Sequence, residues 1–310
     1  MADKLKNLKN HGRETYAVYY GDEFVLKRPL PTTNAAGRAM WLRKQHHTKQ
    51  IIDEIRALDN PLYNIPSMKF INDDEYQILE ERAPGEPLTA NLYAKLTKRQ
   101  QFEIINSFAS FLVDMNELKP IGDIKRHKIA DDLKFSRLDS FIENKMSNWF
   151  TVPEIKRMAK IRDEIGVFEY DTRLAWSHGD LNSGNVLYDA QTSKLSFIDF
   201  AETNYRFIYR DIFGPVPVEL DIYRRVYETY CQLHDKSLYQ MPGIKNDSLR
   251  EIMKYRLIVV GLRRFIKAAD DLRLNPTSEK SAINNTEKVN FMRQQIQNFI
   301  NLERIFQNNR

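Results

Sequence analysis

A short polar segment in the middle of the chain combines a histidine, a carboxylate and a carboxamide. His178, Asp180 and Asn185 follow one another in the spacing H-x-D-x4-N. A carboxylate such as Asp180 can accept a proton from a hydroxyl, and the amide oxygen of Asn185 is a neutral ligand for a hard cation. Asp199 follows inside the apolar sequence Phe-Ile-Asp-Phe, where an ionised carboxylate is costly without a partner. A magnesium ion is the partner that this chemistry predicts.

Each of these residues also has a purely structural interpretation. An isolated aspartate such as Asp199 can be a buried acid that caps a nearby helix, and a buried His178 can brace a loop. For His178 the bracing role is the one we expect. Taken together, the H-x-D-x4-N spacing and the later aspartate are more specific than any single residue. They favour a site that places a base and two metal-binding groups around one transferable phosphate.

The segment resembles the catalytic and metal-binding loops of the aminoglycoside phosphotransferase and choline kinase family, a branch of the protein-kinase-like fold. The family motif H-G-D-x4-N, followed by I-D-F, is matched over residues 178–200. The resemblance implies that Asp180 accepts the proton of the reacting hydroxyl or orients it, and that Asn185 and Asp199 bind Mg²⁺. It also implies that Asp211, which stands where the family has a further aspartate, braces the catalytic loop.

The same resemblance assigns a nucleotide site to the N-terminal residues. Lys27, in an expected strand, would hold the α- and β-phosphates, and a carboxylate of the next helix would fix the position of the lysine. Glu54 is the carboxylate that the family pattern favours, with Asp53 as its close alternative. An inserted stretch, residues 29–50, separates the lysine from this acid and departs from the family pattern.

Two further segments are expected to contact ATP. Gly12 and Thr15 lie where the family has its phosphate-covering loop, although a single glycine departs from a Gly-rich pattern. Residues 79–88 resemble the family hinge, which ends in a P-G-x-x-L pattern. By that resemblance, adenine bonds to the carbonyl of Glu81 and the N–H of Ala83. The same connector can equally be a plain link between two lobes.

The pattern of apolar residues predicts the elements that would position these groups. Gly-Asp and Asn-Asp-Asp turns separate short runs rich in β-branched and aromatic residues, whereas longer stretches have helical spacing. The expected strands are 16–20, 24–27, 67–71 and 75–79, with a later hairpin over 186–200. The expected helices are 38–58, 97–118 with Thr97 as N-cap, and most of 215–310.

These elements and the resemblance together predict an α+β, bilobal protein-kinase-like fold. The N-terminal nucleotide-binding lobe, residues 1–83, is expected to be a small antiparallel sheet with a helix. The C-terminal lobe, residues 84–310, is expected to be larger, mainly helical, and responsible for catalysis and substrate binding. The boundary lies where strand signals give way to long helical periodicity.

Composition excludes several other classes of protein. The chain has 310 residues, 42% hydrophobic and 29% charged, which is typical of a folded soluble protein. A single cysteine rules out an intramolecular disulfide and a Cys-based zinc cluster. The N-terminus lacks the apolar core of a secretory signal, and no apolar run approaches the roughly 20 residues of a membrane span. We therefore expect a cytoplasmic protein without a membrane partner, as a monomer or weak dimer.

Charge points only weakly to a partner. The net charge is +5 and the isoelectric point about 9.0, but basic residues alternate with acids along the chain. The densest basic cluster, between Arg38 and Lys49, is either a solvated helix face or a contact surface for a phosphate-bearing ligand. No aromatic platform or nucleic-acid motif accompanies it, so nucleic acid is not an expected partner.

The predicted function is ATP- and Mg²⁺-dependent transfer of a phosphate to a hydroxyl of a small molecule. The resemblance implies an aminoglycoside-, choline- or amino-alcohol-like acceptor, and the sequence leaves open both its identity and the preference for ATP or GTP. Acidic residues after the metal loop are candidates for binding a cationic acceptor: Glu202, Glu219, Asp221 and Glu228. The alternatives are a protein kinase, against which the absence of H-R-D, D-F-G and A-P-E segments counts, and a catalytically silent nucleotide-binding scaffold of the same fold.

Overall fold

The structure is a computed structural model of the chain. It describes residues 5–7, 15–72, 76–118, 125–128, 151–166, 169–172 and 174–207, together with Asp211, Thr229 and Asn290. The chain divides into two compact units, Met1–Asp123 with Arg173–Tyr239, and Ile124–Thr172 with Gln240–Arg310. The predicted lobe boundary at residues 83–84 lies inside the first unit and stays a prediction.

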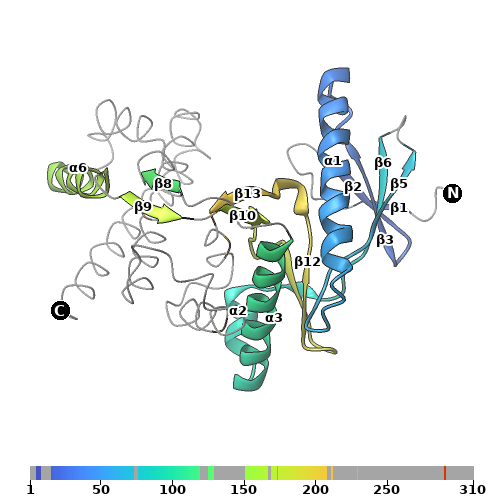
Figure 1. The fold of residues 1–310 in the computed structure, drawn as a ribbon. Helices are drawn as coiled ribbons and strands as arrows, with labels where there is room; N and C mark the ends of the chain where they lie inside the picture. The colour runs from blue at the N-terminus through green and yellow to red at the C-terminus, as the bar shows by residue number, and fades with distance from the viewer. Residues whose placement is uncertain are drawn as a thin grey trace. The chain divides into compact units, whose positions relative to one another are not determined.

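The first unit begins with a five-stranded antiparallel sheet in the order β1-β2-β3-β6-β5 (Figure 1). Its strands are β1 Leu5–Asn7, β2 Thr15–Tyr20, β3 Phe24–Pro29, β5 Met68–Asn72 and β6 Gln77–Glu81, which confirms the four strands expected here. Val25 pairs with Glu80, and Lys27 pairs with Ile78. Residues that lie opposite each other share a face of the sheet, so this register puts Lys27 and Glu80 on the same face.

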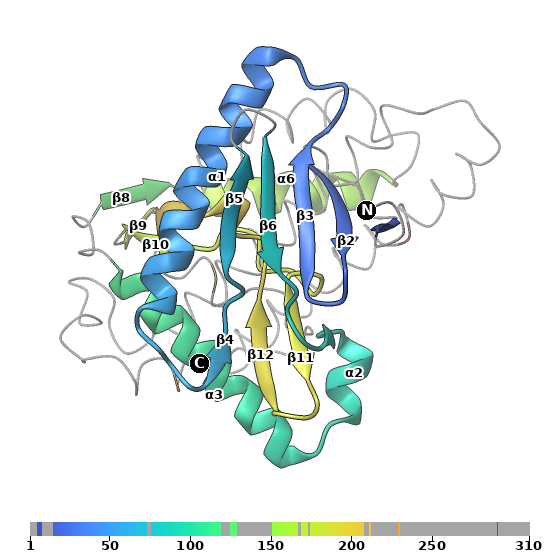
Figure 2. The same ribbon diagram turned by 90° about the vertical axis from the view of Figure 1, so that its right-hand side faces the viewer.

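Helix α1, Ala35–Arg56, lies beside β5 (Figure 2). It starts three residues before the predicted start because the Asn34 side chain caps it, accepting a hydrogen bond from the Gly37 N–H at 2.8 Å. Its buried residues recur at helical spacing: Trp41, Gln45, Thr48, Ile51, Ile52 and Ile55. On the same helix, the His46 ring stacks on Phe70 of β5 with 4.0 Å between ring centroids.

A second sheet carries the predicted hairpin. Its order is β4-β12-β11-β7, and its strands are β4 Tyr63–Asn64, β7 Glu86–Pro87, β11 Val186–Asp189 and β12 Lys194–Phe197. The antiparallel register pairs Val186 with Phe197 and Asp189 with Lys194. The residues just before β11 and just after β12 therefore lie at one end of the hairpin. A separate two-stranded pair, β10 Leu174–Ser177 and β13 Asn204–Phe207, lies on either side of it in sequence.

Gly85, in the connector, shows why the P-G-x-x-L pattern is needed. Its φ is +100°, and a Cβ at this position would lie 2.5 Å from the carbonyl carbon and oxygen of Tyr188. Only glycine allows the connector to approach β11 this closely. The approach aligns β7 with β11, and Leu88, whose N–H donates to the Val186 carbonyl at 2.9 Å, is fully buried.

Two helices follow the connector, α2 Ala90–Lys95 and α3 Lys98–Glu117. The predicted N-cap Thr97 is confirmed and forms a capping box with Gln100. Phe111 of α3 stacks on Phe197 of β12, with ring centroids 3.7 Å apart. Burying each such ring stabilises the fold by about 1.5–3 kcal/mol, and this packing fixes β12 next to the residues that follow it. Phe102 of α3 lies three residues before the buried Ile105 but is itself 60% exposed.

The second unit contains the antiparallel pair β8 Lys125–Lys128 and β9 Glu169–Thr172, and helix α6 Val152–Gly166. Helices predicted over 215–310 lie outside the described residues, apart from Thr229 and Asn290, which are both helical. No helix in the described ranges combines the length and apolar character needed to cross a membrane.

Candidate active site

The loop 178–185 leaves β10 and enters β11. Gly179 has a φ of +83°, which residues with a side chain rarely adopt, so glycine is required where the loop turns. Gly184, the other glycine of the loop, does not adopt a positive φ. The turn instead depends on Asn182, whose side-chain oxygen accepts the Gly184 N–H at 2.8 Å.

His178 is fully buried, with 0% of its surface exposed. Its Nε2 lies 3.0 Å from the Ile198 carbonyl oxygen, and the Asp180 N–H lies 3.4 Å from its Nδ1. A carbonyl only accepts, so Nε2 carries the proton and Nδ1 accepts. Burial lowers the pKa of His178 more than the nearby carboxylates, Asp211 first among them, raise it. A neutral His178 thus ties the loop to the residue before Asp199.

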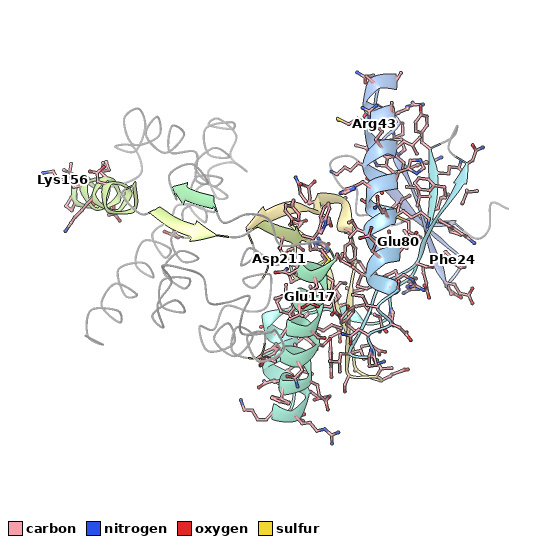
Figure 3. The ribbon with its side chains drawn as sticks, viewed as in Figure 1. Phe24, Arg43, Glu80, Glu117, Lys156 and Asp211 are labelled. Atoms are coloured by element: carbon pink, nitrogen blue, oxygen red, sulfur yellow. The ribbon has the colours of Figure 1, made fainter. Side chains whose placement is uncertain are left out.

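Asp211, labelled in Figure 3, is also buried, at 5% exposure. Its Oδ2 accepts a hydrogen bond from the Ser177 hydroxyl at 2.9 Å, and its Oδ1 accepts the Gly179 N–H at 3.2 Å. The two donors flank His178 in the sequence. The buried Asp211 therefore holds the start of the loop through these two hydrogen bonds.

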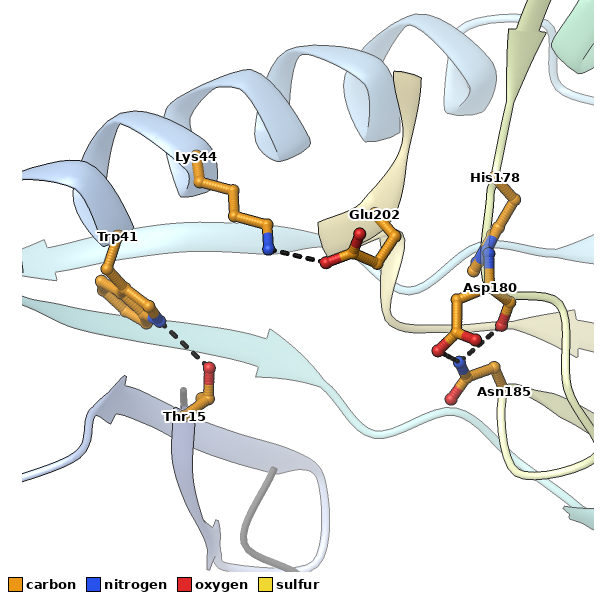
Figure 4. A network of polar contacts seen from close by, with 7 residues as sticks. All are labelled: Thr15, Trp41, Lys44, His178, Asp180, Asn185 and Glu202. Carbon is orange, nitrogen blue, oxygen red and sulfur yellow. Dashed lines mark hydrogen bonds and ion pairs between the residues drawn. The ribbon is translucent and has the colours of Figure 1, made fainter. Parts of the chain in front are cut away.

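Asp180 and Asn185, near the two ends of the loop, are hydrogen-bonded to each other (Figure 4). The Asn185 Nδ2 donates to the Asp180 carbonyl at 2.8 Å and to the Asp180 Oδ2 at 3.1 Å. Both bonds use the amide nitrogen, so the amide oxygen is directed elsewhere and can accept a cation. Asp180 is exposed, and no described residue donates a hydrogen bond to its Oδ1.

Asp199 lies just after β12, at one end of the hairpin. It has the left-handed conformation, with φ 62° and ψ 62°, and precedes the 3-10 turn η3, Phe200–Glu202. Its side chain makes no capping hydrogen bond, and the residue is exposed. The alternative interpretation as a buried acid that caps a helix is therefore wrong. A non-glycine residue in this conformation costs roughly 1–3 kcal/mol, so the surrounding packing must hold it there.

Asn185 and Asp199 fit a magnesium ion. The Ile198 N–H donates to the Asn185 carbonyl at 3.0 Å, which holds the two segments together. Mg²⁺ commonly takes only one or two protein oxygens and completes its shell with phosphate and water oxygens. In the described ranges no three His, Cys, Asp or Glu side chains converge on one point. This donor set suits a cation that arrives with a phosphate rather than one held by protein ligands alone.

Lys27 is fixed by a partner that the sequence did not predict. Its Nζ lies 2.6 Å from Oε2 of Glu80, and the two side chains are only 18% and 11% exposed. Burial alone would lower the pKa of Lys27, but the carboxylates of Glu80 and Asp199 outweigh it and the pKa is raised. The lysine therefore remains charged, and it lies close enough to Asp199 for the two charges to interact.

The predicted ion pair between Lys27 and Glu54 is not the one that the structure contains. Glu54 accepts a hydrogen bond from Gln50 on its own helix at 2.9 Å, and Asp53, the alternative, pairs with Lys49. Both are one-turn contacts along α1, and they leave these carboxylates on the outer part of the helix. The strand register that places Glu80 beside Lys27 takes over the role assigned to the helix.

The predicted adenine contacts lie at the end of β6. The Glu81 N–H donates to the Ser67 carbonyl at 2.9 Å, and its carboxylate accepts the Ser67 N–H at 3.1 Å. The Ala83 N–H makes no hydrogen bond within the described part of the chain. Thr15 accepts a hydrogen bond from the Trp41 indole at 3.0 Å (Figure 4), whereas Gly12 lies outside the described residues.

A cavity of about 880 Å³ opens beside the connector. The residues that line it come from the end of α1, the segment 59–66, the connector 81–84 and the hairpin tip 189–194. Of the predicted site residues, only Glu81 and Ala83 border it. The cavity therefore lies toward the end of the hairpin opposite Asn185 and Asp199, and we do not assign phosphoryl transfer to it.

One of the carboxylates expected to bind a cationic acceptor is already paired. Glu202 Oε1 lies 2.8 Å from Lys44 Nζ of α1. The other three candidates, Glu219, Asp221 and Glu228, lie outside the described residues. Two contacts were thus missed from the sequence, Lys27–Glu80 and Lys44–Glu202. Strand alternation indicates only that Glu80, two residues from the buried Ile78, faces inward and needs a partner; it does not say which residue that partner is.

The antiparallel sheet, the hairpin and the loop that carries the H-x-D-x4-N spacing are features of a phosphotransferase of the protein-kinase-like fold. The sequence profile of the phosphotransferase enzyme family matches residues 8–214, and the chain belongs to that family. The predicted α+β fold class and the predicted enzyme class, a small-molecule kinase, are thereby confirmed. No curated protein sequence matches the chain significantly.

Solved structures show the same fold at low sequence identity. The GDP complex of aminoglycoside 2′-phosphotransferase-IIIa is 14% identical with a TM-score of 0.63, and the match covers 95% of this chain and 92% of that one. A choline/ethanolamine kinase family protein from Mesorhizobium loti is 10% identical with a TM-score of 0.58, and the match covers 96% of this chain and 90% of that one. Macrolide 2′-phosphotransferase type I is 14% identical with a TM-score of 0.54, and the match covers 91% of this chain and 90% of that one.

Proposed function

We propose that the protein transfers the γ-phosphate of ATP to a hydroxyl of a small molecule, in a reaction that requires Mg²⁺. The observation that carries the proposal is that Asn185 bonds to the Asp180 carboxylate and to the backbone of Ile198, the neighbour of Asp199, at one end of the hairpin. The charge of Lys27 interacts with that of Asp199. A silent scaffold would have no need for an exposed carboxylate with one open oxygen beside a cation site.

Each residue of the candidate site has a part in this proposal. Lys27, held by Glu80, would neutralise the α- and β-phosphates, with Thr15 nearby, and the connector at Glu81 and Ala83 would bind adenine. Asn185 and Asp199 would hold Mg²⁺, which when bound supplies charge neutralisation on the phosphate oxygens. Among the solved structures are an ATP complex of APH(2″)-IIa and a GDP complex, so the choice between ATP and GTP needs its own measurement.

Asp180 would handle the proton. The hydroxyl oxygen of the acceptor forms a bond to the γ-phosphorus, the bond from that phosphorus to the β–γ bridging oxygen breaks, and the hydroxyl proton passes to the Asp180 carboxylate. The Asn185 amide holds one carboxylate oxygen of Asp180, which leaves the other to face the acceptor. Phosphoryl transfer has a loose transition state, so positioning and charge neutralisation contribute most of the acceleration.

His178 and Asp211 would position the loop without touching the substrate. The first ties the loop to Ile198 and the second holds the Ser177 hydroxyl and the Gly179 N–H. The acceptor pocket, the cytoplasmic location and the monomeric or weakly dimeric state stay predictions.

A coupled ADP-release assay tests the proposal. The panel would contain aminoglycosides, choline, amino alcohols, sugars and nucleosides, each with Mg²⁺ and either ATP or GTP. We expect release above background with at least one acceptor, and loss of that release when EDTA removes Mg²⁺. Failure to bind any nucleotide in calorimetry would contradict the proposal. Tight Mg-ATP binding with background release on every acceptor would favour the scaffold alternative.

A further inference from the structure

Helix α1 contacts the turn that follows the metal-binding aspartate. Lys44 Nζ of α1 lies 2.8 Å from Oε1 of Glu202, the last residue of η3 (Figure 4). The two residues are 158 positions apart in the sequence. Among described elements, α1 and η3 are in direct contact. The contact therefore joins the helix to the segment that starts one residue after Asp199.

The turn between Asp199 and Glu202 is short and well held. The Thr203 N–H donates to the Phe200 carbonyl at 3.0 Å, which closes it. Phe200 is buried and packs against His178, with ring centroids 4.6 Å apart. Because so few bonds separate Glu202 from Asp199, and Asp199 is in a strained left-handed conformation, a displacement of one changes the position of the other.

The ion pair itself contributes little to stability. The Lys44 side chain is 29% exposed and the Glu202 side chain 54% exposed, and exposed pairs of this kind are screened by water and salt. The pair joins two distant segments beside the left-handed Asp199. We therefore explain it by its effect on the position of this turn rather than by a contribution to stability.

The rest of the helix supports this interpretation. The family resemblance predicted that a carboxylate of this helix fixes the position of Lys27. In the structure Glu80 of β6 pairs with Lys27, and Glu54 accepts a hydrogen bond from Gln50. The carboxylate that pairs with the lysine therefore comes from β6 and not from helix α1. Its charged link to this end of the hairpin runs through Lys44 to the turn after Asp199.

We propose that the Lys44–Glu202 pair positions Asp199 for binding of the magnesium–nucleotide complex, so that Lys44 and Glu202 are positioning residues that touch neither substrate. This rests on the proposed function, because it takes Asp199 as a metal ligand. It also gives Glu202 a role different from binding a cationic acceptor.

The test is a charge swap read by binding rather than turnover. Wild type, Lys44→Glu, Glu202→Lys and the double variant Lys44→Glu/Glu202→Lys would be titrated with the non-hydrolysable ATP analogue AMP-PNP in calorimetry at several Mg²⁺ concentrations. Each single variant places like charges together and should weaken Mg²⁺-dependent affinity about tenfold, a coupling of typical size for contacting residues. The double variant should recover most of the affinity.

Lys49→Glu is the matched control, because it breaks the exposed Lys49–Asp53 pair on the same helix without touching η3. It should bind AMP-PNP as wild type does, and thermal unfolding should show all variants folded. Affinity unchanged in both single variants, or no recovery in the double variant, would overturn the inference alone. A loss that persists when Mg²⁺ is omitted would also overturn it. Wild type that binds no Mg²⁺–AMP-PNP would overturn the proposed function as well.

Discussion

The two ends of the β11–β12 hairpin carry the same residue type in opposite states. At the tip, Asp189 accepts hydrogen bonds from the Gln191 N–H at 3.0 Å and from the Thr192 hydroxyl at 2.7 Å. These bonds, that of Thr192 foremost, lower the pKa of Asp189. At the other end, Asp199 makes no capping hydrogen bond and lies beside Asn185 and near the charged Lys27.

Backbone strain does not distinguish the two ends. Ser193 at the tip has a φ of 57° and Asp199 at the base a φ of 62°. The difference lies in the hydrogen bonds of the carboxylate, since Asp189 accepts two within its own turn while the Asp199 side chain makes no capping hydrogen bond. A carboxylate left open beside a second oxygen donor and a cation is therefore a better sign of a binding site than a strained residue alone.

In the comparison of the two ends of the hairpin, the largest expected effect comes from Asp199. Asp199→Asn removes the negative ligand and should lower kcat about 10²–10³-fold or more, a loss typical of removing one electrostatic contact to the reacting group. It should also weaken Mg-ATP binding in calorimetry. The control is Asp189→Asn, with the same chemical change at the tip, which should keep both values. Equal losses from both variants would erase the distinction between the two ends.

Gly85, which packs against the middle of β11, should give the next effect. Gly85→Ala puts a Cβ 2.5 Å from the Tyr188 backbone at a φ of +100°, and should destabilise the fold by at least about 2 kcal/mol. Gly21→Ala is the control, because its φ is +68° but no atom lies within 4 Å of the added Cβ. It should cost only the conformational strain of about 1–2 kcal/mol. Urea unfolding measures both, and equal losses would show that the close approach to β11 is unimportant.

The buried His178 should make the free energy of unfolding depend on pH. Burial holds its pKa below the ordinary 6.5, so the unfolded chain binds the proton more readily than the folded one. Stability should therefore fall as the pH drops below 6.5, by at most about 1.4 kcal/mol per pH unit for this proton. His178→Gln removes the titrating group, and its free energy of unfolding should depend less on pH between 7 and 5. Parallel pH dependences for the two proteins would contradict a buried neutral His178.

The smallest effect is expected at the tip. Asp189→Asn should change the free energy of unfolding by no more than about 0.5 kcal/mol, as most surface substitutions do. Because the pKa of Asp189 lies below its ordinary 3.8, its contribution is present above that pH and is lost as the pH falls further. Thermal unfolding at pH 7 and pH 3 would show wild type and variant converging at the lower value. A large loss at pH 7 would mean that the tip is more than a local turn.

Local patterns in the sequence were enough to predict most of the elements near the site. Turn residues and β-branched runs gave the strands on both sides of Lys27, and the Thr97 cap and helical spacing gave α3. The H-x-D-x4-N spacing brought Asp180 and Asn185 together because only a short loop separates them. These features depend on neighbours in the sequence, which is where such patterns carry information.

Contacts between distant segments could not be predicted in the same way. Lys27 and Glu80 are 53 residues apart, and their pairing depends on the register of β3 against β6. The resemblance pointed to the helix instead, and so to Glu54. The Lys44–Glu202 contact depends on where α1 meets η3, which no periodicity specifies. The exposure of Phe102 shows the same limit, since helical spacing does not say how wide the covered face is.

The measurement that bears most directly on the proposed chemistry is the turnover of Asp180→Asn with the acceptor that the panel identifies. The substitution keeps the size of the side chain and an oxygen that can accept from Asn185, but removes the proton acceptor. We predict that kcat falls about 10²–10⁴-fold, the usual contribution of a general base, while Mg-ATP affinity in calorimetry stays close to wild type. Near-normal turnover by this variant would contradict the assignment of Asp180 as the base.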